Sequence, residues 1–200
     1  MKAIIYISLS IFLVFSFQQT KLRSKEITES FSKKEIKDLE KTVKFFSIEM
    51  CGTGISFEEC MNNSINDLAE NGWQLILRNI DINNQLNLYR SFESDIFEEI
   101  WTFCRTSNPR EGWIRRSICY NQEGKYDEFL SKVGQENPIV KAYHEDLKTS
   151  GDFIGIVRFE REIYHKTGKI DVEDPNIQLI LAIEYLSQND NEKRREPWSE

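Results

Sequence analysis

The sequence predicts an all-α domain of about seven helices, stapled by two disulfides. Apolar residues recur at three- and four-residue steps along most of the chain, as they do on the buried face of a helix. Serine–glutamate capping boxes and Asn-Pro or Asp-Pro pairs mark helix starts, and glycines mark helix ends. Four cysteines in a chain with an apolar leader indicate a disulfide-bonded exported protein.

The chain begins with Met1 and Lys2, followed by an almost wholly apolar run over residues 3–17. A short basic start and an apolar stretch of about 7–15 residues are typical of a secretory signal peptide. As a helix the run would measure about 22 Å, less than the roughly 30 Å hydrocarbon core of a bilayer. We therefore expect a signal peptide over 1–16, a secreted or periplasmic protein, and no stable membrane span after leader removal.

Composition divides the rest of the chain into three parts. Residues 17–31 are polar and charged, and they predict a flexible linker. Residues 32–187 predict one helical domain, with a subdomain boundary near residue 122 as an option. Residues 188–200 are strongly polar and predict a disordered tail, in which a run of three basic residues is solvated.

Two capping boxes predict a helical hairpin at the start of this domain. Ser32 with Glu35, and Ser56 with Glu59, have the spacing at which a hydroxyl and a carboxylate satisfy the first backbone amides of a helix. An apolar stripe follows each box, and glycines follow each stripe. The short loop between the two helices carries one cysteine on each side.

The segment 73–89 fits two periodicities. Trp73, Ile76 and Leu77 have helical spacing, but apolar residues also alternate, and Asn83-Asn84 could form a turn. We predict helix, because an isolated hairpin needs support from other elements. A short β-hairpin at 73–89 is the alternative.

A chain reversal follows. Helical spacing over residues 94–106 predicts a helix, which Asn108-Pro109 and Gly112 break before a second apolar segment carries Cys119. We therefore expect a corner between two segments, around which the other helices pack. The residues with helical spacing are Ile96, Phe97, Ile100, Trp101 and Cys104.

Four helices are predicted in the last third of the chain. The first covers 126–133 and ends at a glycine, and the second covers 138–148, with Asn-Pro at its start. The third covers 153–166. The last begins at Pro175, where Asp-Pro again provides a cap and a first-turn proline.

The four cysteines predict two disulfides, for which three pairings exist. The sequential pairing, Cys51 with Cys60 and Cys104 with Cys119, closes two short loops and staples two corners. The other pairings would tie the corners to each other. Zinc binding by the four thiolates is the functional alternative, but no Cys-x-x-Cys spacing occurs and export favours oxidation.

The sequence contains little that indicates catalysis. Only two histidines are present, His144 and His165, and a serine or cysteine nucleophile generally needs an adjacent base. Glu162 and His165 have the spacing of half a di-iron site, but the second half is missing. No phosphate loop, dinucleotide turn or His-Glu-x-x-His occurs. We therefore expect no enzyme activity, no metal and no cofactor.

Charge and aromatic content indicate the kind of partner. A net charge of −7 argues against nucleic acid and against anionic membrane surfaces. Aromatic residues beside glycines or breaks, such as Trp73, are candidates for exposure, and near arginines they are typical anchors of protein interfaces. The predicted protein-binding residues are Trp113, Arg110, Arg115, Arg116 and Tyr120.

These observations favour a secreted helical binding protein that docks on another protein, as an inhibitor, immunity factor or effector does. The alternative is a carrier of a small apolar ligand in a cavity between the helices. A cavity lined by Phe and Leu would favour the carrier, whereas an exposed Trp/Arg surface would favour docking.

Overall fold

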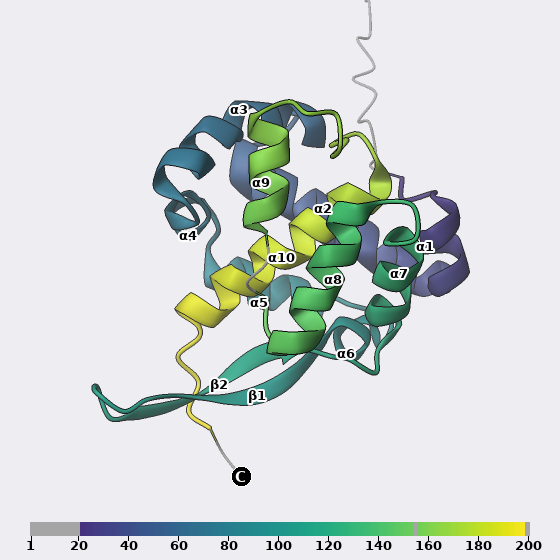
Figure 1. Cartoon of the computed structure of the whole chain (residues 1–200). Helices are drawn as coiled ribbons and strands as arrows, with labels where there is room; N and C mark the ends of the chain where they lie inside the picture. Colours follow the sequence, from purple (N-terminus) through teal and green to yellow (C-terminus); the bar gives the residue numbers. More distant parts are fainter. Residues whose placement is uncertain (1–20, 154–155, 199–200) are drawn as a thin grey trace, which may run out of the picture.

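The computed structural model describes residues 21–153 and 156–198, and the predicted leader over 1–16 lies outside them. The described part is mostly helical, with ten helices and one two-stranded antiparallel sheet (Figure 1). The elements are α1 (Lys25–Ser30), α2 (Lys33–Cys51), α3 (Phe57–Asn71), α4 (Gln74–Asn79), α5 (Ile82–Arg90), α6 (Ile96–Ile100), β1 (Trp101–Asn108), β2 (Trp113–Tyr120), α7 (Lys125–Val133), α8 (Pro138–Ser150), α9 (Val157–Tyr164) and α10 (Pro175–Lys193).

Helix α10 crosses the middle of the molecule and organises its core (Figure 1). It is buried along most of its length, as expected for a helix that is apolar on several faces. It packs against α2, α4, α5 and β2, while α1 packs against α7 and α3 against α9. Segments from both sides of residue 122 therefore share one hydrophobic core.

The predicted helical hairpin is present as α2 and α3. The Ser32 side chain accepts a hydrogen bond from the Glu35 amide, and the Glu35 carboxylate accepts one from the Ser32 amide, so the capping box is complete. The Ser56 side chain caps α3 through the Glu59 amide. Gly52 follows α2 with φ of +88°, a conformation that favours glycine.

The prediction of a flexible linker over 17–31 is wrong for the part that the structure describes. Helix α1 lies within it, and Leu22, Ile27 and Phe31 are buried in the core. A helix of six residues is too short to show a clear apolar period. Its order comes from packing against α2 and α7, which the local sequence does not reveal.

Helix over 73–89 is confirmed, and the alternative of a β-hairpin is wrong. The segment forms α4 and α5, which are separated at Ile80 and Asp81. The Asp81 carboxylate accepts hydrogen bonds from the amides of Asn83 and Asn84. The two asparagines therefore lie in the first turn of α5 and not in a hairpin turn.

The prediction of a helix over 94–106 is wrong beyond Ile100. Helix α6 ends there, and β1 begins at Trp101 and pairs with β2 in antiparallel register. The prediction of a helical domain stapled by two disulfides is confirmed, and the fold includes one small two-stranded hairpin that the all-α prediction lacked. The Trp101 side chain is buried, and its indole Nε1 donates a hydrogen bond to Ser187 Oγ of α10 at 2.7 Å. This contact with a distant helix overrides the local helical spacing.

The four C-terminal helices are present as α7 to α10, with the Asn137-Pro138 and Asp174-Pro175 starts confirmed. Helix α9 is shorter than predicted and begins at Val157.

The prediction of a disordered tail from residue 188 is wrong for the residues that the structure describes. Helix α10 continues to Lys193, and Arg194 is buried against Asp190, to which its guanidinium donates bonds at 2.6 and 2.7 Å.

Candidate functional site

Strands β1 and β2 form an arm that extends from the helical part of the molecule (Figure 1). We call residues 101–120 the hairpin arm and the remaining described residues the helical body. Only the base of the arm is buried, at Trp101, Ser117, Ile118 and Tyr120. The turn is tight, because the Gly112 amide donates to the Asn108 carbonyl at 2.8 Å and Gly112 has φ of +70°.

Both disulfides of the sequential pairing are present. Cys104 and Cys119 are joined across the arm, with their Cα atoms 5.8 Å apart. Cys51 and Cys60 join the end of α2 to the start of α3, with Cα atoms 5.6 Å apart. The Cys104–Cys119 disulfide ties β1 to β2 near the base of the arm, and the turn lies beyond it.

The C-terminal segment pairs with the outer edge of β2. The Arg116 amide donates to the Glu196 carbonyl at 2.9 Å, and Arg115 and Pro197 form an antiparallel bridge. The Arg194 guanidinium also forms an ion pair with Glu196 at 2.8 Å. The arm is therefore fixed at its base by a disulfide and along β2 by the chain end.

The arm has two faces with different side chains. Residues directly opposite in an antiparallel pair share a face, and successive residues alternate between faces. The register therefore places Trp113 and Arg115 on the face of the disulfide. The opposite face carries exposed or half-buried side chains beyond the buried base, namely Phe103, Arg105, Ser107, Ile114 and Arg116.

Trp113 and Arg115 form a stacked pair on the disulfide face. The Arg115 guanidinium lies 3.8 Å from the centroid of the Trp113 ring, close enough for a cation–π interaction. The Trp113 indole Nε1 donates a hydrogen bond to the Glu111 carboxylate at 2.6 Å. Trp113 is half-buried, so part of the ring stays in contact with water.

The other face exposes two apolar residues that the sequence interpretation missed. Phe103 and Ile114 are each 44% exposed, although both lie in a sheet. The guanidinium of Arg116 lies 4.8 Å from the centroid of the Phe103 ring. The alternation of β2, with Ile114, Arg116 and Ile118 at every second position, was the available signal for this face.

The arm carries a positive charge that the body lacks. Its four arginines and one glutamate give the arm a net charge of +3. Because the whole chain has a net charge of −7, the remaining residues carry −10. Among the residues described, Arg105, Arg110 and Arg115 form no ion pair, whereas Arg116 pairs with Glu196 at 4.0 Å. Three cationic side chains of the arm thus have no ion-pair partner within residues 21–153 and 156–198.

Tyr120 does not belong to the exposed surface of the arm. Its ring is buried and contacts Tyr126 and Phe153 edge-on, because β2 enters the core at this point. Its hydroxyl donates to Asp127 Oδ1 at 2.7 Å, and burial raises the pKa of Tyr120 well above its usual range. We therefore remove Tyr120 from the predicted binding residues.

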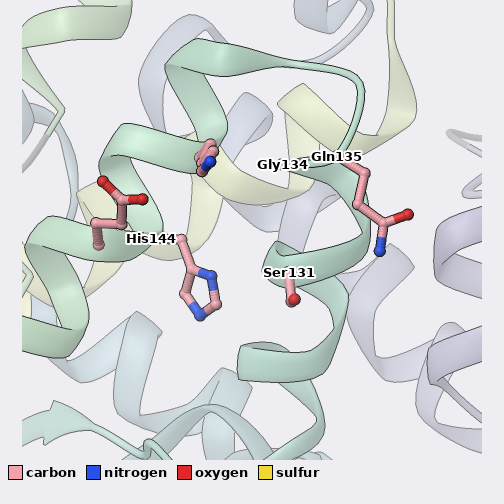
Figure 2. Close-up of a pocket in the computed structure, with 6 residues that line it drawn as sticks. Ser131, Gly134, Gln135 and His144 are labelled. Atoms are coloured by element: carbon pink, nitrogen blue, oxygen red, sulfur yellow. The ribbon is translucent and has the colours of Figure 1, made fainter.

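A shallow hollow of about 310 Å³ lies between α7 and α8. Figure 2 shows His144 and Ser131 beside the same open space, from α8 and α7 respectively. Its lining is mostly polar, so it does not favour an apolar ligand. The lining residues are Ser131, Gly134, Gln135, Lys141, His144 and Glu145.

The His144 side chain in this hollow is hydrogen-bonded to a carboxylate and not to a nucleophile. Its Nε2 lies 2.7 Å from Asp127 Oδ1. Burial opposes ionisation of Asp127, but hydrogen bonds from His144 and Tyr120 outweigh it and lower the pKa of this carboxyl. In the described part of the chain Ser131 Oγ makes no hydrogen bond, so the geometry holds no serine–histidine pair.

The second histidine lies at the end of α9 and is exposed. Its sequence partner Glu162 is buried and accepts a hydrogen bond from Thr167 Oγ1 at 2.6 Å, so this carboxylate is already engaged. Over residues 21–153 and 156–198, no three His, Cys, Asp or Glu side chains lie close enough together to hold a metal ion.

No protein-family model, curated protein or solved structure matches the chain. No property of the arm or of the hollow is therefore carried over from a relative. Within the described helices, none combines the length and the apolar character that crossing a bilayer requires.

Proposed function

We propose that this chain is an exported binding protein that docks on an acidic surface of another protein through its hairpin arm. An inhibitor, an immunity factor or an effector acts in this way. The observation that carries the proposal is a set of three arginines on the arm, Arg105, Arg110 and Arg115, that form no ion pair with the described residues. They share the arm with a half-buried tryptophan, and the rest of the chain carries a net charge of −10. Tryptophan and arginine are the residues most enriched at the energetic centres of interfaces.

The construction of the arm supports this use. The disulfide, the tight turn and the stacked pair of Trp113 and Arg115 restrict the arm before any partner arrives. Docking therefore orders few further groups, and the entropy lost on binding is small.

The charge distribution also supports it. An acidic protein is repelled by most acidic surfaces, and a basic arm offers one place where such a surface is attracted. The attraction also acts before contact, so it raises the association rate and selects the orientation of approach.

The test begins with the protein that co-purifies with the mature chain from its native fluid. We expect Trp113→Ala to weaken binding of that protein by about 2 kcal/mol or more, roughly 30-fold, because hot-spot residues act on this scale. Arg110→Ala and Arg115→Ala should mainly slow association, with effects that shrink in high salt. Binding kinetics by surface plasmon resonance measure both.

Trp73→Ala is the matched control, because Trp73 is 39% exposed next to a glycine but lies in the helical body. It should leave the affinity unchanged. If Trp113→Ala instead lowered the Tm sharply and weakened binding only as far as it unfolded the protein, Trp113 would be a core residue and the proposal would fail.

A further inference from the structure

The two edges of the hairpin arm differ in their backbone hydrogen bonds. On β2, the amides of Arg116, Ile118 and Tyr120 all point away from β1. Arg116 N donates to Glu196 O at 2.9 Å, Ile118 N to Asn191 Oδ1 at 3.2 Å and Tyr120 N to Gly151 O at 3.1 Å. The outer edge of β2 is therefore occupied by the C-terminal segment, by α10 and by the loop after α8.

The same three bonds fix the direction of the backbone groups of β1. In an antiparallel ladder, a directly opposite pair either exchanges both its hydrogen bonds or directs all its groups outward. The backbone groups of Arg116 and Ile118 point away from β1, so those of their partners Arg105 and Phe103 point away from β2. Because this direction alternates along a strand, the backbone groups of Ser107 point away from β2 as well. The N–H and C=O groups of these three residues have no partner among the described residues.

An open edge of this kind is a template for another strand, and proteins usually block it with proline, a bulge or a covering element. Residues 101–108 contain no proline, and β1 pairs with β2 without an interruption in register. Phe103 and Arg105 are both exposed on this edge.

We propose that an extended acidic segment of the partner protein adds to the outer edge of β1 as a third strand of the sheet. This inference rests on the proposed function and specifies how the arm recognises its partner. Main-chain hydrogen bonds to Phe103, Arg105 and Ser107 supply affinity, and alternate side chains of the added strand supply selectivity.

The side chains of the arm specify the chemistry of the added strand. An acidic residue opposite Arg105 meets an arginine that has no ion pair in the described chain. Two positions away on the same face, an apolar residue meets the exposed Phe103 ring. The matching segment therefore has acidic and apolar residues at every second position.

A second copy of this chain is a poor occupant of the same edge. Pairing β1 with β1 of another copy would bring together two arms of net charge +3 each. Like charges opposite one another in a sheet are destabilising, and a pairing centred on Arg105 would place this arginine opposite its own counterpart. The charge therefore favours an acidic partner over self-association.

The experiment uses the whole mature protein, labelled with ¹⁵N, and the synthetic peptide acetyl-Thr-Glu-Thr-Val-Thr-Glu-Thr-amide. The peptide should slow hydrogen exchange of the Phe103, Arg105 and Ser107 amides at least tenfold at saturation. The amides of Cys104 and Thr106 already lie in the ladder with β2 and should not change. The same peptide N-methylated at alternate residues keeps the side chains but loses the strand donors, and it should bind at least tenfold more weakly.

A variant of the chain gives an independent check. Ser107→Pro removes an outward-facing donor and no ladder bond, and proline is tolerated on strand edges in this position. It should leave the Tm within a few degrees of the wild type and weaken the peptide at least fivefold. A Glu-to-Lys version of the peptide should not bind measurably.

Three outcomes would overturn the inference. One is binding of the N-methylated peptide as tightly as the parent, which would show docking through side chains alone and leave the proposed function standing. Another is failure of the parent peptide to bind. The third is a dimer of the free protein with these same amides protected, since a second copy would then be the occupant. The Trp113 assay with the native partner tests the proposed function separately.

Discussion

Helix α10 of the body is buried along most of its length, whereas β1 of the arm buries only Trp101 of its eight residues. Burial of apolar area stabilises the body through many contacts, each of which is small. Beyond its buried base the arm lacks that contribution and relies on a disulfide, a tight turn and pairing with the C-terminal segment. The comparison shows how covalent and backbone contacts can restrain a surface element that has no core of its own.

The two regions also treat their polar groups differently. Inside the body, Gln85 Nε2 donates to the Leu186 carbonyl at 2.7 Å, and Asn189 Nδ2 donates to Gln85 Oε1 at 2.8 Å. These two amides are hydrogen-bonded to each other and to the α10 backbone, although Asn189 Oδ1 and the Tyr126 hydroxyl are buried without a partner among the described residues. On the arm, the outward-facing backbone amides of β1 and the side chains of three arginines have no hydrogen-bond or ion-pair partner within the described part of the chain. A region in which most buried polar side chains are hydrogen-bonded is suited to stability, whereas one with available backbone donors and charges is suited to binding.

The largest effect expected from this difference comes from the same substitution made in each region. Phe46→Ala in α2 should lower the free energy of unfolding by about 3–5 kcal/mol, the usual cost of removing a buried phenylalanine. Phe46 is fully buried, stacks on Tyr185 with ring centroids 5.5 Å apart and contacts Phe57. Urea denaturation with both disulfides intact measures the change.

Phe103→Ala is the matched substitution on the arm, where the ring is 44% exposed. It should cost less than about 1 kcal/mol, as most surface substitutions do. Equal losses at the two positions would contradict the distinction between a packed body and a solvated arm.

A smaller effect is expected from removing the staple of the arm. The double variant Cys104→Ser/Cys119→Ser should lower the free energy of unfolding by about 2–4 kcal/mol, because the bridge no longer restricts the unfolded chain. It should also raise hydrogen-exchange rates of the arm amides before those of α10, since the arm has few other restraints. Calorimetry and exchange mass spectrometry measure the two effects.

The Cys51–Cys60 bridge provides the comparison, since Cys60 is fully buried in the body. Its removal should affect α2 and α3 and leave the arm amides unchanged. If the Cys104–Cys119 bridge could be removed without altering the arm first, the stability of the arm would have to come from other contacts.

Much of the body could be predicted because its signals are local. A serine and a glutamate three residues apart define the start of α2, and Asn137 with Pro138 defines the start of α8. The sequential disulfides follow the same logic, since each bridge joins cysteines 9 or 15 residues apart. Such features depend only on residues inside one short window.

The arm could not be predicted because its partners are distant in the sequence. Trp101 is fixed by Ser187, and Arg116 by Glu196, each about 80 residues further along the chain. The sequence close to residue 101 does not contain that information, so the spacing of its apolar residues predicted a helix. The tryptophan and arginines of the candidate site could be proposed from composition. The open edge of β1 could not, because it depends on the register of the strands.

The last and smallest effect concerns the joint between the two regions. Asp38 of α2 is buried and holds the segment that precedes α6: its Oδ2 accepts bonds from the Glu93 and Ser94 amides at 2.9 Å each and from Ser94 Oγ at 2.7 Å. Lys41 donates to its Oδ1 at 2.8 Å. Burial opposes ionisation, but the hydrogen bonds from Lys41 and Ser94 outweigh it and lower the pKa of Asp38 below its ordinary 3.8.

A carboxylate whose pKa is lower in the folded state stabilises the fold above its unfolded pKa, and this contribution is lost as the pH falls through the folded value. Asp38→Asn should therefore cost about 2 kcal/mol at pH 7, the range for hydrogen bonds to a charged group, and progressively less below about pH 4. Urea denaturation between pH 2 and 7 measures the difference. Asp146→Asn is the control, because its ion pair with Arg158 is exposed and should contribute less than about 1 kcal/mol. A cost for Asp38→Asn that did not change with pH would mean that the shape of the side chain, and not its charge, holds the entry to the arm.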